Sequence, residues 1–163
     1  MIVLGIDPGY AIVGIGVVQC VNGKFKSLYH QAIKTSSKQL FPARLNCIFK
    51  DLTIILNRYK PDIVAIESLF FNTNTSTAIQ VAQARGVMLL ACELQGIKTL
   101  SFTPLQVKTA VCGQGTATKK QVQYMVKHLF AFVKAPSLDD ITDALALAVC
   151  GFYETKYKTK LVV

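Results

Sequence analysis

Short apolar runs separated by turn residues open the chain, a pattern typical of β-strands. Residues 2–6 form a continuous apolar run, as expected of a strand that is buried on both faces. A second strand is predicted over about residues 11–19 and a third over about residues 24–33. Between them, Asn22-Gly23 favours a hairpin turn, because both residues tolerate positive φ. Three antiparallel strands are therefore predicted at the start of the chain.

Helical spacing of apolar positions follows, and it alternates with further short apolar runs. The first helix is predicted from about Pro42 to Tyr59, and its buried stripe consists of Leu45, Ile48, Phe49, Leu52, Ile55, Leu56 and Tyr59. The elements predicted after it are a strand at 63–66, a helix at about 76–95, a strand at 97–102, helices at about 104–113 and 118–130, and a last helix from Ser137.

This order of elements predicts an α/β fold. A hairpin meander followed by β–α units gives a mixed five-stranded sheet, three antiparallel and then two parallel strands, flanked by helices on both faces. A strand that enters after a crossover helix runs parallel to its neighbour. We therefore expect strand 63–66 to lie beside strand 2–6 and to point the same way.

The length of 163 residues favours one domain. We predict a single domain over residues 1–153 and a disordered Lys-rich tail over residues 154–163. No apolar run reaches the roughly 18 residues that a membrane span needs, so we expect no transmembrane segment. The first nine residues lack the basic region of a signal peptide. Five widely spaced cysteines favour reduced thiols and a cytoplasmic location.

The charge balance points to a polyanionic partner. Lys and Arg number 18 against 9 Asp and Glu, which gives a formal net charge of +9. Lysines neutralise phosphates and release counterions when a protein binds nucleic acid. Because only three of the basic residues are arginines, backbone binding is favoured over extensive base readout. A basic surface that serves only solubility is the alternative.

The few acids occupy informative positions, beginning with the ends of two predicted strands. Asp7 follows the apolar run 2–6, and Glu67 follows the run 63–66. Parallel neighbouring strands would bring both carboxylates to the same edge of the sheet, where they would repel each other unless a cation joined them. The alternatives are a turn-capping role for Asp7 before Pro8-Gly9 and a solvent-facing strand end for Glu67.

A third group of acids lies at the start of the last predicted helix. Asp140 and Asp143 are spaced i, i+3, so one helix face presents both, and the pair Asp139 and Asp143 also shares a face. The spacing leaves this choice open. Acids in a first turn also favour the helix dipole, and Ser137 with Asp140 resembles a capping box. Asp143 lies beyond that turn and is poorly explained by capping.

Four oxygen donors from two strand ends and a helix suit Mg²⁺ or Mn²⁺. Two such ions about 3.5–4 Å apart can activate a water and stabilise the leaving 3′ oxygen of a phosphodiester. A basic surface around an acidic pocket fits that chemistry, because lysines would hold the strand and metals would neutralise the carboxylates.

Taken together, the motifs resemble the RuvC family of Holliday junction resolvases over residues 1 to about 151. They are Ile6-Asp7-Pro8-Gly9, Ala65-Ile66-Glu67, Gln83-Ala84-Arg85-Gly86-Val87, Gln106-Val107-Lys108, residues 113–123, and Asp140-Ile141-Thr142-Asp143-Ala144-Leu145-Ala146. The resemblance implies a ribonuclease H-like fold, a homodimer, and paired Mg²⁺-dependent nicking of four-way DNA junctions in recombination and repair. It implies two ions per subunit, with Mn²⁺ able to substitute. It also implies a partnership with a branch-migration motor complex of the RuvA and RuvB type.

Carried over residue by residue, the resemblance assigns the catalytic and metal-binding roles to Asp7, Glu67, Asp140 and Asp143. The family pattern selects Asp140 over Asp139, and Asp143 would be either a ligand or an acid–base group. The DNA-binding residues would be Phe70, which would stack on bases, and Lys108, Lys119 and Lys120, which would contact phosphates. The alternatives are a core role for Phe70 and a solvated helix face for Lys119 and Lys120.

The resemblance also implies that the helix at 76–95 mediates dimerisation. Ala82 and Gly86 would allow close backbone approach there, although the same small residues could pack on the sheet. Two other functions compete. One is an ATP-binding domain of the actin and sugar-kinase type, which shares the turn at residues 7–9 but normally needs two lobes. The other is a non-catalytic nucleic-acid-binding module, which predicts loss of one or more carboxylates.

Overall fold

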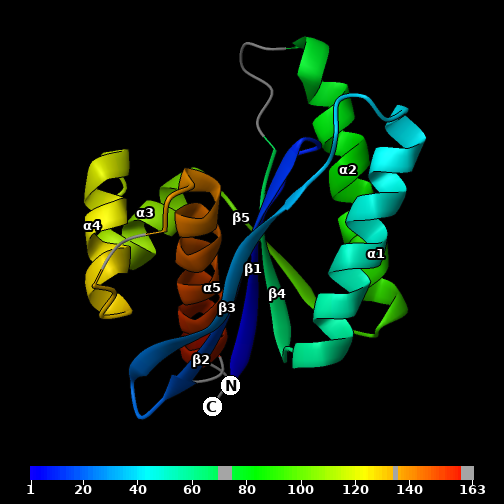
Figure 1. Ribbon diagram of the computed structural model, residues 1–163. Helices are drawn as coiled ribbons and strands as arrows, with labels where there is room; N and C mark the ends of the chain where they lie inside the picture. The colour runs from blue at the N-terminus through cyan, green and yellow to red at the C-terminus, as the bar shows by residue number, and fades with distance from the viewer. Residues whose placement is uncertain (70–74, 134–135, 159–163) are drawn as a thin grey trace.

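Five strands form one sheet in the order β3-β2-β1-β4-β5 (Figure 1). The structure is a computed structural model that describes residues 1–69, 75–133 and 136–158. The strands are β1 (Ile2–Asp7), β2 (Ile12–Val21), β3 (Lys24–Lys34), β4 (Ile63–Glu67) and β5 (Thr99–Phe102). β1, β2 and β3 pair antiparallel, and β4 and β5 continue the sheet in parallel from β1. The predicted mixed five-stranded sheet is confirmed, with β4 beside β1.

The first hairpin turns at the predicted residues. Asn22 has φ of 51° and Gly23 has φ of 78°, so both occupy the left-handed region that a tight two-residue turn needs. β5 is shorter than its apolar run suggests, since it begins at Thr99 rather than at residue 97. Gly96 has φ of 65°, which matches its predicted place just after the end of a helix.

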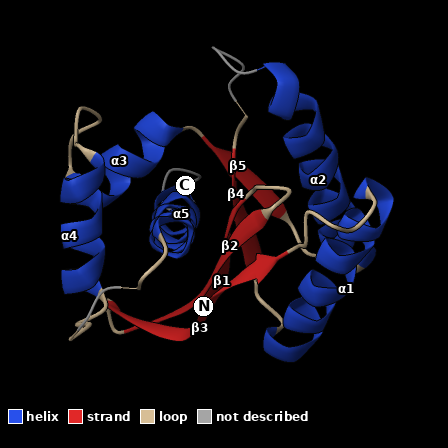
Figure 2. Ribbon diagram, turned by 45° about the horizontal axis from the view of Figure 1, so that its top comes forward, coloured by secondary structure: helices blue, strands red, loops and turns tan. Residues whose placement is uncertain are grey.

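Helices cover both faces of the sheet and give three layers (Figure 2). α1 (Phe41–Tyr59) and α2 (Thr75–Leu94) lie on one face, and α3 (Pro104–Cys112), α4 (Lys119–Leu129) and α5 (Asp139–Lys158) lie on the other. Each face of the sheet has its own apolar core, one built on Leu4 and Ile6 and the other on Val3 and Ala65. This alternation follows from the period of two along a strand.

α5 lies directly against the backbone of β1 and β2, because glycines face it. A Cβ added at Gly5 would lie 1.8 Å from the carbonyl oxygen of Ala144, and one at Gly14 would lie 2.0 Å from that of Asp140. Both distances are far below any van der Waals contact, so any side chain at these positions would push the helix away from the sheet. The glycines therefore set how closely the start of α5 approaches the ends of the strands.

The first half of the predicted basic tail is helical. α5 begins at Asp139 and continues to Lys158, so residues 154–158 are helical rather than disordered. Aromatic packing explains the extension: the rings of Tyr153 and Tyr157 stack with centroids 6.0 Å apart, and the Lys156 ammonium lies 5.5 Å from the centroid of the Phe152 ring. Residues 159–163 of the predicted tail lie outside the described residues.

Candidate active site

Asp7 and Glu67 lie side by side at the carboxyl ends of β1 and β4. The parallel register pairs Ile6 with Ile66, and each acid is the next residue of its strand. Along β1, Val3 and Gly5 face the α5 layer, and along β4 Ala65 does the same. Because side chains alternate, Asp7 and Glu67 point toward the α5 face of the sheet.

The start of α5 brings Asp140 and Asp143 to the same place. Gly14 pairs with Asp7 across the β1–β2 ladder, and the main chain of Asp140 lies against Gly14. Asp143 lies one turn further along α5 and is half-buried. The structure therefore brings together the four acids that the sequence analysis singled out.

Crowding among these carboxylates changes their protonation. Burial, followed by the charges of Glu67, Asp143 and Asp140, raises the pKa of Asp7 to about 8. Burial and the charge of Asp143 raise the pKa of Glu67, although a hydrogen bond with Asp7 opposes that rise. Burial also raises the pKa of Asp143. The cluster thus carries more negative charge than its surroundings compensate, which favours binding of a proton or a cation.

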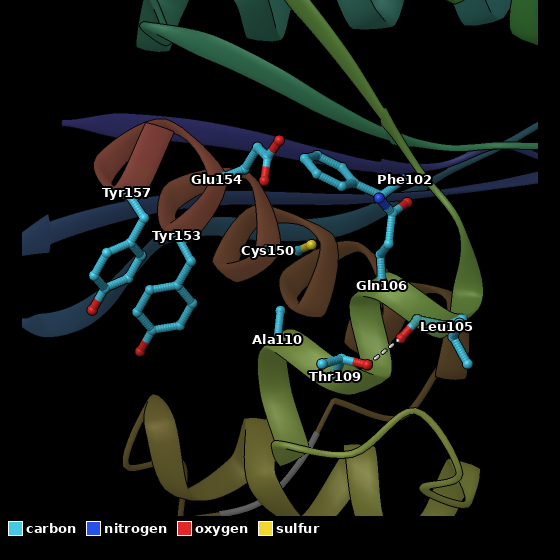
Figure 3. A pocket seen from close by; sticks show the side chains of 9 residues that line it. All are labelled: Phe102, Leu105, Gln106, Thr109, Ala110, Cys150, Tyr153, Glu154 and Tyr157. Atoms are coloured by element: carbon cyan, nitrogen blue, oxygen red, sulfur yellow. Dashed lines mark hydrogen bonds between the residues drawn. The ribbon is translucent and has the colours of Figure 1, made fainter. Parts of the chain in front are cut away.

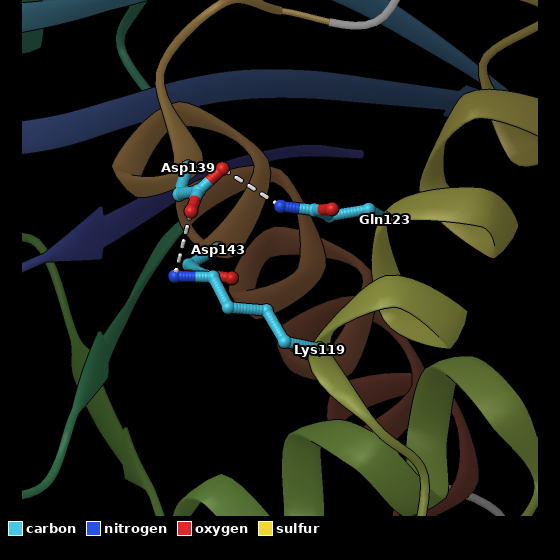
Figure 4. A network of polar contacts seen from close by, with 4 residues as sticks. All are labelled: Lys119, Gln123, Asp139 and Asp143. Carbon is cyan, nitrogen blue, oxygen red and sulfur yellow. Dashed lines mark hydrogen bonds and ion pairs between the residues drawn. The ribbon is translucent and has the colours of Figure 1, made fainter.

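Lys119 supplies a positive charge at the edge of this cluster (Figure 4). Its Nζ lies 3.4 Å from Oδ2 of Asp143 and 3.2 Å from Oδ2 of Asp139. The other oxygen of Asp139 accepts a hydrogen bond of 2.7 Å from Nε2 of Gln123. Burial alone would lower the pKa of the Lys119 ammonium, but the hydrogen bonds and charges of Asp139 and Asp143 outweigh it and raise that pKa.

A pocket of about 280 Å³, the carboxylate pocket, has two of the four acids and two of the predicted lysines in its lining. Glu67, Asp143, Lys108 and Lys119 line it, together with the apolar side chains of Pro104, Val107, Val122 and Leu147. Its walls come from β4, α3, α4 and α5. Acids and lysines in one apolar-walled pocket can bind a phosphate group and a cation next to each other.

Lys120, the third predicted lysine, does not line this pocket. Lys120 is exposed and lines a different hollow on α4, beside Gln114 and Tyr124. Phe70 lies outside the described residues. A third hollow, of about 320 Å³, lies between α3 and α5 and is lined mainly by apolar and aromatic side chains such as Phe102, Leu105 and Tyr153 (Figure 3). None of the predicted site residues lines it, so the smaller carboxylate pocket is the better candidate for chemistry.

The donor chemistry of the cluster fits a hard divalent cation, since carboxylate oxygens are the ligands that such ions prefer. As the side chains stand, however, no three His, Cys, Asp or Glu residues within 1–69, 75–133 and 136–158 are placed to hold a metal ion together. The divalent cation predicted at these acids stays a prediction. Coordination would require the carboxylates to turn toward a shared ion, and Asp143 to turn from its pairing with Lys119.

Arg85 supports the site, and the sequence analysis gave it no role. Its Nε donates a hydrogen bond of 3.0 Å to the main-chain oxygen of Glu67, and its Nη2 donates one of 2.7 Å to Oγ of Ser101. These bonds fix the end of β4 to α2 and β5. Two signals in the sequence point to Arg85: it lies in the family motif Gln83-Ala84-Arg85-Gly86-Val87, and the only other charged residue of α2 is Glu93.

The sheet order and the helix layers define a ribonuclease H-like fold. The chain belongs to the RuvC family. The family model described as crossover junction endodeoxyribonuclease RuvC matches residues 3–151.

Individual relatives extend this match over the full chain. The crossover junction endodeoxyribonuclease RuvC of Alkaliphilus metalliredigens is 51% identical over 98% of this chain and 100% of its own length. That of Clostridioides difficile is 46% identical over 99% of this chain and 95% of its own length. The solved structure of T. thermophilus RuvC in complex with Holliday junction substrate is 33% identical, with a TM-score of 0.93, and covers 98% of this chain and 97% of that one.

Proposed function

We propose that this protein is a crossover junction endodeoxyribonuclease, which resolves four-way DNA junctions by paired hydrolysis of phosphodiester bonds in recombination and repair. The observation that carries the proposal is the convergence of Asp7, Glu67, Asp140 and Asp143, next to Lys108 and Lys119, in a chain of the RuvC family. Two chemical requirements of this reaction, acidic oxygen donors and a basic phosphate-binding wall, meet in one pocket.

The four acids are proposed to hold Mg²⁺, two ions per subunit, with Mn²⁺ able to substitute. The raised pKa of Asp7, Glu67 and Asp143 supports this, because a bound cation would offset the charge that burial leaves uncompensated. When bound, Mg²⁺ would supply an activated water and stabilise the leaving 3′ oxygen. Asp143 stands as a ligand or as an acid–base group.

The lysines are proposed to orient the DNA strand. Lys108 and Lys119 lie on the wall of the pocket opposite the sheet, where their ammonium groups can pair with phosphates on either side of the bond to be cut. Lys120 would contact DNA outside the pocket, on the exposed side of α4. Stacking of Phe70 on bases at the junction centre stays a prediction, as does the partnership with a RuvA and RuvB type motor.

The protein is further proposed to act as a homodimer through α2. Three large apolar side chains on this helix are exposed: Ile79 by 68%, Leu90 by 53% and Leu94 by 65%. A Cβ added at Gly86 would meet nothing within 4 Å, so Gly86 faces open space rather than the sheet. Two-fold symmetry would place two active sites to match a two-fold junction, which suits paired cuts.

Its cellular setting is proposed to be the cytoplasm. All five cysteines are free thiols, as expected where thiols stay reduced. Within the described part of the chain, no helix is both long and apolar enough to cross a membrane.

The deciding experiment incubates the protein and Mg²⁺ with labelled four-way junctions and with linear duplex of the same sequence. We expect paired nicks in the junction only, and a loss of at least about a hundredfold in the Asp7→Asn variant, because one of the charge-stabilising groups is gone. Asp51→Asn, the same change on α1 across the sheet, is the matched control and should cleave normally. Equal nicking by wild type and Asp7→Asn would refute the proposal, and ATP hydrolysis without cleavage would favour the actin and sugar-kinase alternative.

A further inference from the structure

Four polar side chains join α4 to α5 in a short ladder (Figure 4). Lys119 and Gln123 are spaced i, i+4 on α4, and Asp139 and Asp143 are spaced i, i+4 on α5, so each pair stands on one helix face. The Lys119 ammonium bridges the two aspartates at 3.2 and 3.4 Å, and Gln123 holds the free oxygen of Asp139 at 2.7 Å.

Asp139 differs from the other acids in its surroundings. Its side chain is 59% exposed, whereas that of Asp143 is 35% exposed. The charges that raise the pKa of Asp7 come from Glu67, Asp143 and Asp140. Glu67 and Asp143 line the carboxylate pocket, whereas Asp139 lies on the side of Lys119 that faces Gln123. Its direct partners are therefore Lys119 and Gln123.

Stability does not account for this arrangement. An exposed ion pair between surface side chains contributes little to folding, since water screens the charges and both side chains lose freedom. An acid on the DNA side of a nuclease also repels phosphates. What the ladder does provide is a defined position for a long, flexible lysine side chain, because Asp139 is itself fixed by Gln123.

We propose that Asp139 is a positioning residue that holds the Lys119 ammonium at the rim of the carboxylate pocket. The inference rests on the proposed nuclease function. Lys119 pairs with both aspartates here, so Asp139, as an anchor outside the pocket, would keep the ammonium in place if Asp143 turned to a cation. The ammonium then faces the phosphate in a fixed place instead of sampling its many rotamers.

The proposal and a simple charge effect predict opposite changes in the cleavage rate when Asp139 is replaced. If Asp139 were only a surface charge, its removal would raise the net charge from +9 to +10, tighten junction binding and leave cleavage unchanged or faster. If Asp139 positions Lys119, Asp139→Asn should bind the junction in EDTA at least as tightly as wild type, yet cleave about fivefold to tenfold more slowly under single-turnover conditions with saturating Mg²⁺.

A double-mutant cycle tests whether the effect passes through Lys119. The variants are Asp139→Asn, Lys119→Met, the double variant, and Asp51→Asn as a matched loss of one acid on α1. We expect the double variant to cleave no more slowly than Lys119→Met alone. Wild-type cleavage by Asp139→Asn, or the same fold-loss in the Lys119→Met background, would overturn the proposal.

A second readout does not depend on cleavage. In ¹H–¹⁵N spectra of the lysine ammonium groups in EDTA, the Lys119 signal, assigned by its loss in Lys119→Met, should show slow proton exchange in wild type and fast exchange in Asp139→Asn. Unchanged exchange would overturn the proposal even if cleavage fell. If wild type failed to nick junctions, the proposed function would fail, while these spectra would still decide whether Asp139 holds Lys119.

Discussion

Asp7 is the side chain on which the electrostatics of the site depend most. Its pKa of about 8 stands far above the 3.8 of an ordinary aspartate, because burial and three neighbouring acids disfavour its charge. Without metal, Asp7 therefore keeps a proton at neutral pH in the folded protein but ionises in the unfolded chain. Below about pH 4, Asp7 is protonated in both the folded and the unfolded chain. Asp7 therefore destabilises the folded state only as the pH rises from about 4 to 8.

The loss of folding stability with rising pH predicts how Asp7→Asn changes that stability in EDTA. The amide has the shape of the neutral acid and cannot ionise, so the variant should gain stability over wild type as the pH rises, with the largest difference near pH 8. Thermal unfolding of both proteins at pH 5, 6, 7 and 8 measures the difference directly. Comparison between the two removes the contribution of all other titrating groups.

Mg²⁺ provides the complementary control. A cation that binds only the folded state stabilises it more the tighter it binds, and it binds the ionised cluster best, so added Mg²⁺ should raise the melting temperature of wild type at pH 8 more than that of Asp7→Asn. A variant that melts below wild type at pH 8 in EDTA, or that gains as much from Mg²⁺, would contradict this account of the site.

Among the elements, the contact between α5 and the β1–β2 hairpin has the largest effect on the site. Gly14→Ala would place a Cβ 2.0 Å from the carbonyl oxygen of Asp140, a main-chain atom that cannot move alone. We expect the start of α5 to shift, with a loss of about 1–3 kcal/mol in the free energy of unfolding. Because Asp140 and Asp143 move with the helix, cleavage should fall at temperatures where the variant is fully folded.

Val13→Ala is the matched control for this prediction. Val13 neighbours Gly14 but is buried in the core on the α1 and α2 side of the sheet. Its truncation should cost about 2 kcal/mol while the α5 contact stays intact. Urea unfolding and single-turnover cleavage of both variants separate the two effects. If Gly14→Ala cleaved as well as Val13→Ala at equal stability, the close approach of α5 would have no role in the site.

Much of the element order could be predicted from the sequence, because period-two and helical patterns report which face is buried. The predicted parallel entry of β4 is enough to place Asp7 and Glu67 together, since it needs only the order of elements and the alternation of side chains. The end of α5 was missed because Glu154 and three lysines resemble a solvated tail, whereas the aromatic rings of Tyr153 and Tyr157 continue the helix.

The ladder of Lys119, Gln123, Asp139 and Asp143 could not be predicted in the same way. Helical spacing shows that each pair shares a face of its own helix, but it does not show that the two faces meet. That depends on how α4 packs on α5, which is set by side-chain shapes across the interface rather than by periodicity. The same limit applies to Arg85, whose partners come from two other elements.

For the whole molecule, the exposed apolar side chains of α2, Ile79, Leu90 and Leu94, form the proposed dimer interface. Leu90→Asp should convert a homodimer to a monomer, because an acid at the centre of an apolar interface is left unpaired. Sedimentation equilibrium measures the mass. On a supercoiled plasmid with an extruded cruciform, wild type should give linear product from paired cuts, whereas the monomer should give mainly nicked circles.

Leu105→Asp is the control for that experiment. Leu105 is also a largely exposed leucine, at 63%, but it lies on α3 across the sheet from α2. The Leu105→Asp variant should keep the mass of the wild-type protein and its yield of linear product. A Leu90→Asp protein with the same mass as wild type would show that subunits meet through another surface, or that the protein acts alone.

The division of the site between β1, β4 and α5 also bears on synthesis at the ribosome. β1 and β4 emerge early and can pair, but Asp140 and Asp143 join them only after α5 has been made and has docked on Gly5 and Gly14. A nascent chain that already binds DNA through its lysines would thus carry half of its acids and no complete centre. If these four acids form the proposed centre, that centre is complete only when the whole fold is, so a partly made chain would not yet cleave DNA.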